Sequence, residues 1–395
     1  MGRGSLADRF IQKITSGNIA YQAVLKQFPL HPRAFWRCLL SLWSIFRSRE
    51  TSFYPVFLGI ESTAKCNLRC DFCPRTEFLS RDVGDMDFDF FCQVIDEVNP
   101  VFITLSQFGE PLLHPRIADM IYYAASRSRI VRITTNATLL TKPMSEALLK
   151  TRLDHLLISF DSCRKETYER LRKGARFERV VENIKTFLAL KKQYGRSTPV
   201  VSFNVTLSKD NIVEIRPMID FCRKEFGLEP TFTMMYTYGE EVLKARSANE
   251  ADIKDVQAGV EYARSLNLPG LAQNLQTLLN KMSTPDFSDA RPCFWPYYTT
   301  TVSWDGKVYP CCVYFDCQMV LGDLTQQSFK AVWNGDRYRR FRRTLRASRT
   351  PFALCRTCSL SDDNVNNALS RCLRFAPFLK PLSQRNFIET GMKHE

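Results

Sequence analysis

The sequence has no uninterrupted apolar run near the ~20 residues that a bilayer-spanning helix needs, so we expect no transmembrane segment. Its N-terminus carries arginines but lacks the apolar core and small-residue cleavage site of a secretory signal peptide. The 14 cysteines are too sparse among 395 residues for a small secreted fold held together by disulfides. Several of them instead stand in tight clusters, which favours metal ligation in a reducing compartment. These features predict a cytoplasmic protein.

Positive charge exceeds negative charge, with 55 lysines and arginines against 41 aspartates and glutamates. This excess favours an anionic partner. Two segments concentrate it, residues 31–49 with their tryptophans and arginines, and residues 337–349, RYRRFRRTLRASR. We expect both to be helices packed by their apolar sides, with peripheral membrane contact as the alternative for the first and a phosphate-bearing substrate, lipid or RNA for the second. Base-stacking aromatics are not interleaved with the charges, so we expect no nucleic-acid partner.

Three cysteines, Cys66, Cys70 and Cys73, form a Cx3Cx2C pattern. Thiolates are soft ligands, and clusters of them favour zinc or iron–sulfur sites. A closed zinc site needs four ligands, whereas a [4Fe–4S] cluster held by three cysteines keeps one iron open for another ligand. The spacing therefore predicts a metal site and leaves open an iron–sulfur cluster or zinc with a distant fourth ligand.

Residues 55–240 alternate short apolar runs with longer amphipathic stretches. The apolar runs predict six strands, at residues 56–61, 101–106, 130–135, 155–160, 200–206 and 231–236. The stretches between them predict helices at residues 88–98, 116–126, 145–150, 168–194 and 214–226. Six such units in a row indicate an α/β fold with a parallel sheet and helices outside it. Sites in such sheets lie at the carboxyl ends of the strands, where the cysteine pattern follows the first strand.

These motifs together resemble the radical S-adenosylmethionine (SAM) enzymes. The aromatic Phe72 before the third cysteine belongs to the same pattern, and Gly109-Glu110-Pro111 is similar to the family's Gly-Gly-Glu-Pro loop. The resemblance implies a partial (β/α)6 TIM-like barrel and a [4Fe–4S] cluster whose free iron chelates S-adenosylmethionine. It also implies that Gly109 and Glu110 receive the amino group of that cofactor.

Four further positions resemble cofactor-binding residues of this family. Asn136, after the third strand, either bonds the cofactor or closes its own turn. Ser159, at the end of the fourth strand, is a candidate for the methionine or ribose groups, and Asp161 either contacts ligand or caps the next helix. Arg172, in the stretch ETYERLRKG, either meets the cofactor carboxylate or is a solvated helix charge.

Cysteines return in the last quarter of the chain, beside a predicted hairpin over residues 302–310 with Asp305-Gly306 at its turn. This part resembles the SPASM/twitch extension of radical SAM enzymes. A Cx5Cx3C continuation is missing, so the resemblance implies one auxiliary [4Fe–4S] cluster rather than two, held by Cys293, Cys311, Cys355 and Cys358. Cys312 and Cys317 are left over as spare ligands, hydrogen-atom donors to a substrate radical or, by default, small buried residues.

The expected organisation is a basic helical leader, a radical SAM (β/α)6 core, a helical linker, a SPASM/twitch domain and a C-terminal tail, at residues 1–53, 54–240, 241–290, 291–362 and 363–395. The favoured function is a radical SAM oxidoreductase or epimerase. Its expected partners are a small-molecule substrate, such as a sugar, aminocyclitol or lipid headgroup, and an electron donor such as flavodoxin or ferredoxin.

The first alternative is a peptide-modifying maturase. It is ranked lower because the leader is short for a peptide-recognition domain. The second alternative is a non-catalytic metal-binding scaffold, against which the intact Cx3Cx2C pattern argues.

Overall fold

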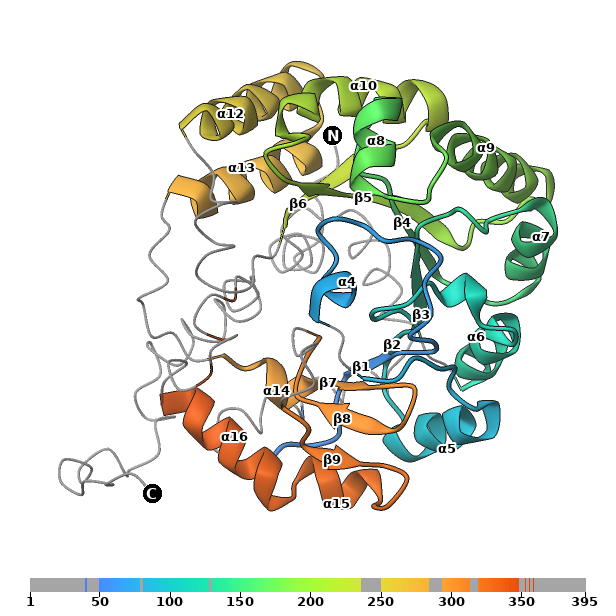
Figure 1. Cartoon of the computed structure of the whole chain (residues 1–395), viewed down its shortest axis with the longest axis vertical. Coiled ribbons are helices and arrows are strands. Elements are labelled where there is room, and N and C mark those ends of the chain that lie inside the picture. The colour runs from blue at the N-terminus through green and yellow to red at the C-terminus, as the bar shows by residue number, and fades with distance from the viewer. Residues whose placement is uncertain are drawn as a thin grey trace, which may run out of the picture.

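A single nine-stranded sheet organises the computed structural model, with the strand order β6-β5-β4-β3-β2-β1-β7-β8-β9 (Figure 1). The structure describes residues 40, 50–78, 81–127, 130–235, 250–283, 293–312, 319–347, 352, 355 and 358. The basic leader up to residue 49, apart from residue 40, and the C-terminal tail therefore lie outside the described residues. No helix in the described ranges is both long and apolar enough to cross a membrane.

The first six strands are parallel, as expected, and each pairs with its neighbour along the chain. They begin and end within two residues of their predicted bounds: β1 Phe57–Ile60, β2 Phe102–Thr104, β3 Ile130–Thr135, β4 His155–Ser159, β5 Val200–Leu207 and β6 Pro230–Met234.

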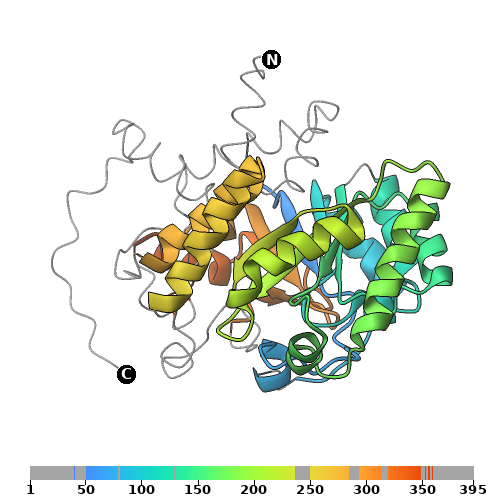
Figure 2. The same ribbon diagram turned by 90° about the horizontal axis from the view of Figure 1, so that it is seen from above.

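The helices form an arc around the outside of these strands (Figures 1 and 2). They are α5 Phe88–Val98, α6 Ile117–Ser126, α7 Lys142–Lys150, α8 Lys165–Leu171, α9 Phe177–Gln193 and α10 Ile215–Phe226, with 3-10 turns at Pro111–Leu113 and Ile212–Glu214. The short helix α4 Pro74–Phe78 is not part of this arc and is drawn near the centre of Figure 1. Strand side chains that face the helices are deeply buried, as Leu156, Ile158, Val201 and Phe203 illustrate. The hydrophobic core therefore lies between the sheet and this arc of helices.

One predicted helix is wrong. A single helix was expected over residues 168–194, but the chain breaks between α8 and α9. Gly174 lies in the break with φ +97°, a conformation that favours glycine. Its ideal Cβ position is 3.3 Å from the Asn67 carbonyl oxygen, so the break brings the chain against the cysteine loop.

The segment predicted as a linker contains two helices packed on the sheet edge, α12 Glu250–Ser265 and α13 Pro269–Ser283. The helix break expected at residues 269–270 lies slightly earlier, at Asn267 with φ +56°, and Pro269 begins the next helix. Asn274 accepts a hydrogen bond from the Phe232 amide (2.9 Å) and donates one to its carbonyl (3.0 Å). These helices thus cover and hydrogen-bond the otherwise unpaired edge of β6.

The C-terminal part continues the same sheet. β7 Thr299–Val302 pairs in parallel with β1, and β8 Lys307–Tyr309 and β9 Gly322–Asp323 follow antiparallel. The predicted hairpin with its turn at Asp305-Gly306 is confirmed by this pairing. The short helix α14 Trp295–Tyr298 precedes β7, and α15 Phe329–Trp333 and α16 Asp336–Ala347 follow β9.

The basic helix α16 packs by the apolar face that its sequence predicts, with Tyr338, Phe341 and Leu345 buried. Arg342 is also fully buried, which the pattern does not indicate. Its guanidinium lies 4.2 Å from the Trp333 ring centroid and donates to the carbonyls of Pro296, Trp333 and Glu50. This arginine therefore links α14, α15 and the backbone at Glu50.

Candidate functional site

The cysteine loop, residues 66–73, is separated from β1 by five residues and ends where α4 starts. α4 lies near the centre of the view in Figure 1. Cys70 is buried, whereas Cys66 and Cys73 are half-buried. The backbone amides of Arg69 and Asp71 donate to the carbonyls of Lys173 (2.9 Å) and Leu171 (3.1 Å), at the end of α8. The loop is therefore held by a second, distant part of the chain.

The three thiols act on one another electrostatically. Burial raises the pKa of the Cys70 thiol to about 12, and the neighbouring Arg172 opposes this while Cys73 and Cys66 add to it. Burial likewise raises the pKa of the Cys66 thiol, with Cys73 contributing. Without a cation, burial therefore favours the protonated form of the Cys66 and Cys70 thiols, and bound iron would turn such thiols into thiolate ligands.

The chemistry of this donor set fits an iron–sulfur cluster, because thiolates are soft ligands and three of them leave one iron of the cube open. Cys66, Cys70 and Cys73 supply three ligands to such a cube.

The loop after β2 packs directly on the segment that enters the cysteine loop. A Cβ on Gly109 would lie 2.1 Å from the Thr63 carbonyl oxygen and 2.6 Å from that of Lys65. The next residue, Glu110, donates its backbone amide to the Lys65 carbonyl at 2.8 Å. Only glycine allows this approach at position 109, which brings Glu110 next to the cysteines.

Protein donors already occupy the buried Glu110 carboxylate. It accepts from the Thr135 hydroxyl (2.6 Å), the Asn136 amide (2.7 Å) and the Leu112 amide (3.2 Å). Burial nevertheless raises the pKa of Glu110 to about 6, against the effect of these donors. Three bonds leave acceptor capacity on two carboxylate oxygens, so a further donor such as an ammonium group can still bind.

Asn136 closes its own turn, one of its two expected roles. Its side-chain oxygen accepts hydrogen bonds from the backbone amide (2.9 Å) and the hydroxyl (2.6 Å) of Thr138. Its side-chain nitrogen donates to the side-chain oxygen of Asn67 at 3.1 Å. Asn67 also donates to the Thr138 hydroxyl at 2.8 Å. The sequence did not single out Asn67, although it lies within the Cx3Cx2C pattern, or Thr138.

Asp161 and Arg172 form a buried ion pair, with the guanidinium 2.6 Å from the carboxylate. The expectation that Arg172 might be a solvated helix charge is therefore wrong, because Arg172 turns inward after α8 ends. Asp161 does not cap α8 either, since it pairs with Arg172 and accepts from the Thr206 amide at 2.8 Å. The Arg172 guanidinium lies 5.7 Å from the ring centroid of Phe72, and the half-buried Ser159 ends β4.

Four C-terminal cysteines, Cys293, Cys311, Cys355 and Cys358, are half-buried. Cys358 acts electrostatically on Cys312, and Cys311 acts on the buried Tyr338. The assignment of the four to one auxiliary cluster stays a prediction, and Cys317 lies outside the described residues. Cys312 is exposed rather than a small buried residue, and desolvation by the surrounding protein raises the pKa of its thiol to about 12.

A contact between the two halves of the chain was not predicted. Glu61, buried just after β1, pairs with Arg81 and accepts from the Trp304 amide at 3.2 Å. The Trp304 ring packs on Gly84 so closely that a Cβ there would lie 2.4 Å from it. The β7–β8 hairpin thereby fixes the segment that follows the cysteine loop, because a residue larger than glycine does not fit at position 84.

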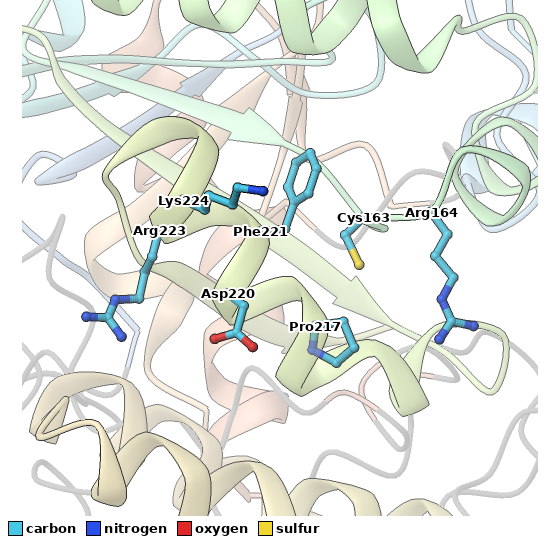
Figure 3. A pocket seen from close by; sticks show the side chains of 7 residues that line it. All are labelled: Cys163, Arg164, Pro217, Asp220, Phe221, Arg223 and Lys224. Carbon is cyan, nitrogen blue, oxygen red and sulfur yellow. The ribbon is translucent and has the colours of Figure 1, made fainter.

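A surface hollow of about 820 Å³ lies elsewhere, between the loop after β4 and α10 (Figure 3). It is lined by Cys163, Arg164, Pro217, Asp220, Phe221, Arg223 and Lys224. Burial and the Glu214 carboxylate raise the pKa of Cys163 to about 12, so this thiol is a poor nucleophile. The hollow contains none of the predicted site residues, and we do not assign the chemistry to it.

Comparison with protein-family models gives two matches. Residues 60–222 match the radical SAM superfamily, and residues 293–359 match SPASM, an iron–sulfur cluster-binding domain. The first range contains the cysteine loop and the Gly109-Glu110 loop, and the second contains the four C-terminal cysteines.

Similar curated proteins include a tungsten-containing aldehyde ferredoxin oxidoreductase cofactor-modifying protein of Pyrococcus furiosus. It is 23% identical over 78% of this chain and 88% of that protein. A PqqA peptide cyclase of Gluconobacter oxydans is 25% identical over 65% of this chain and 70% of that protein.

Among solved structures, Streptococcus suis SuiB is similar in fold, with a TM-score of 0.58 and 16% identity over 90% of this chain and 88% of that one. The anSMEcpe structure with bound AdoMet and a peptide has a TM-score of 0.57 and 17% identity over 82% and 98%. The matched domains imply a [4Fe–4S] cluster with S-adenosylmethionine, and auxiliary iron–sulfur binding. This chain is therefore a radical SAM enzyme with a C-terminal SPASM domain.

Proposed function

We propose that the protein oxidises a substrate held at the inner face of its sheet, the face opposite the outer helices. The proposed reaction is hydrogen-atom abstraction by a radical generated at the cysteine loop. When bound, the cluster and S-adenosylmethionine supply a 5′-deoxyadenosyl radical, which takes a hydrogen atom from a C–H bond. The observation that carries this proposal is the packing of Gly109 and Glu110 on the backbone of Thr63 and Lys65, at the entry to the cysteine loop.

The chain's own residues then orient the cofactor. Glu110 is proposed to accept from its amino group, since its carboxylate retains acceptor capacity. Arg172 is proposed to bind its carboxylate, because the buried Arg172 Nε has no hydrogen-bond partner among the described residues. Ser159, Asn136 and the ring of Phe72 are proposed to complete the site. Asn136 is proposed to contribute through its backbone or by positioning Asn67, because its side chain is already hydrogen-bonded to Thr138 and Asn67.

The four C-terminal cysteines are proposed to hold one auxiliary cluster, which would supply an acceptor for the electron left on the substrate and so allow a net two-electron oxidation. Reduction of the first cluster is assigned to a flavodoxin or ferredoxin. Epimerisation remains the competing outcome, and it would require a thiol to return a hydrogen atom. Cys312 is the exposed candidate for that thiol.

A peptide substrate has support of its own beside a small molecule. The relatives include a PqqA peptide cyclase, and SuiB has also been solved with its precursor peptide. The Pyrococcus furiosus relative is instead named for modifying a cofactor. We therefore propose a peptide side chain and a small polar molecule as the two substrate classes to be tested.

The radical chemistry is tested with protein reconstituted anaerobically with iron and sulfide. With reductant and S-adenosylmethionine, the wild type is expected to release 5′-deoxyadenosine and methionine. Cys66→Ala is expected to release neither, whereas Cys92→Ala, a half-buried thiol on α5, serves as the matched control. Release by Cys66→Ala at the wild-type rate would refute the proposal.

The substrate class is tested with an extract of the source organism grown in deuterated water. A true substrate is expected to transfer deuterium into 5′-deoxyadenosine, detected by mass spectrometry. If peptidase digestion of the extract abolishes the transfer, the substrate is a peptide. If the transfer survives digestion and passes a small-pore filter, the substrate is a small molecule.

A further inference from the structure

The side chain of Tyr168, on α8, carries a buried hydroxyl without a partner. The residue is fully buried, and its hydroxyl has no hydrogen-bond partner among the described residues. Its ring centroid lies 5.1 Å from that of Phe160 and 5.5 Å from that of Phe177. These ring contacts prevent the hydroxyl from turning to solvent. A buried polar atom of this kind is costly unless a bound group satisfies it.

The helix that carries Tyr168 ends against the cysteine loop. One turn after Tyr168, the Arg172 amide donates to the Tyr168 carbonyl at 2.8 Å. Carbonyls at and just beyond the end of α8 accept from the backbone amides of Arg69 (2.9 Å) and Asp71 (3.1 Å). These two residues flank Cys70, which is itself buried. Tyr168 therefore lies one helical turn from the backbone that positions both neighbours of Cys70.

Electrostatic interactions also connect Tyr168 with this cysteine. Burial raises the pKa of the Tyr168 hydroxyl, Arg172 opposes the rise, and Asp161 and Cys70 add to it. The phenol therefore stays protonated, so it can donate a hydrogen bond.

The groups around this hydroxyl narrow the choice of an acceptor. Arg172 has only donors to offer. The carboxylates of Asp161 and Glu110 already accept from other parts of the chain, and neither is hydrogen-bonded to Tyr168. The Cys70 sulfur becomes a thiolate when it holds iron, because a bound metal deprotonates its thiol ligands. The acceptor on this side is therefore completed only when the cluster is bound.

We propose that the Tyr168 hydroxyl donates a hydrogen bond to a sulfur atom of the bound first cluster, on its Cys70 side, and thereby raises the reduction potential of that cluster. Hydrogen bonds to cluster sulfurs are among the factors that set this potential, and they stabilise the more negative, reduced state. The inference rests on the proposed function for the presence of the first cluster, and it adds a residue that tunes its reduction. It assigns Tyr168 to the cluster and not to S-adenosylmethionine.

The test uses the reconstituted holoenzyme, poised anaerobically at set potentials and read by electron paramagnetic resonance. The signal of the first cluster is the one that changes when S-adenosylmethionine is added, which separates it from the auxiliary cluster. At the potential where the wild type is half reduced, the reduced-to-oxidised ratio of the first cluster is expected to fall at least about threefold in Tyr168→Phe. Tyr262→Phe is the matched control and is expected to keep the wild-type ratio, because it removes a hydroxyl on α12 that donates to Asp220 at 2.7 Å.

Urea unfolding of the metal-free proteins separates this role from a structural one. Tyr168→Phe deletes a hydroxyl without a partner, so the unfolding midpoint is expected to stay the same or to rise. An unchanged reduced-to-oxidised ratio would overturn the proposal, and so would a lower midpoint, which would reveal a partner within the protein. If the wild type shows no signal that responds to S-adenosylmethionine, the proposed function is refuted and this inference with it.

A second measurement does not require Tyr168→Phe to fold. 3-Fluorotyrosine in place of Tyr168 keeps the hydroxyl and puts a fluorine next to it. Electron–nuclear double resonance on the reduced first cluster is expected to show a coupling to this fluorine, because a hydroxyl that bonds a cluster sulfur brings the edge of its ring to the cluster. The same label in place of Tyr262 is expected to show none. A missing coupling at position 168 would contradict the proposal.

Discussion

The Arg172 guanidinium lies 2.6 Å from the Asp161 carboxylate, and neither side chain is exposed by more than 7%. Asp161 follows β4 and Arg172 follows α8, so the pair joins the carboxyl ends of these two consecutive elements. Arg172 also lies close enough to Cys70 to oppose the rise in that thiol's pKa. The ion pair therefore sets the position of the positive charge that lowers the pKa of Cys70.

Removing Asp161 is expected to destabilise the protein strongly. Asp161→Ala leaves Arg172 buried without its counter-charge, which costs ~3–5 kcal/mol of unfolding free energy. Urea unfolding of the metal-free protein measures this cost. Asp210→Ala breaks the exposed pair with Arg170 and is the control, expected to cost at most about 1 kcal/mol. Similar costs for both variants would mean that the Asp161–Arg172 pair is not desolvated.

Gly109→Ala is expected to prevent loading of the first cluster. The added Cβ falls 2.1 Å from the Thr63 carbonyl oxygen, so the two loops must separate. The measurement is iron content and iron–sulfur absorbance after reconstitution. Gly195→Ala is a control with nothing within 4 Å of the added carbon, so it pays only the cost of its left-handed backbone. Normal cluster loading by Gly109→Ala would contradict the close approach.

His155 is expected to make stability depend on pH. Burial and the Arg132 charge lower its pKa in the fold to about 3, from the ordinary value of 6.5, so the unfolded chain binds the proton first as pH falls. The stabilisation is therefore complete above about pH 6.5 and is lost as pH decreases toward 3, with a slope approaching about 1.4 kcal/mol per pH unit. Unfolding curves of metal-free wild type and His155→Gln at pH 7.5 to 5 test this. The same pH slope in both proteins would show that His155 is not desolvated.

Removing an auxiliary ligand is expected to halve the iron. Cys358→Ala should lower the content from about eight irons to about four per chain, since each cube holds four. The first cluster should remain, so reductive cleavage of S-adenosylmethionine is expected to continue. Iron analysis with Mössbauer or electron paramagnetic resonance spectra separates the two clusters. A full complement of iron in Cys358→Ala would remove this residue from the ligand set.

Much of the fold follows from local patterns. Each strand of the parallel sheet is a short apolar run between amphipathic stretches, and both periodicities are set by neighbouring residues. The cysteine loop was placed correctly after β1 because Cys66, Cys70 and Cys73 lie close together in the chain. Gly109 and Glu110 were likewise identified because they are adjacent and directly follow a strand.

The tertiary structure alone decided which distant groups meet. Arg172 has the sequence context of an exposed helix charge, and only the end of α8 turns it toward Asp161. The pairing of β7 with β1 makes the SPASM strands part of the main sheet, and no local signal specifies that pairing. Thr104, Arg132 and His155 lie side by side because of the register of β2, β3 and β4. Packing of these strands against the outer helices sets that register.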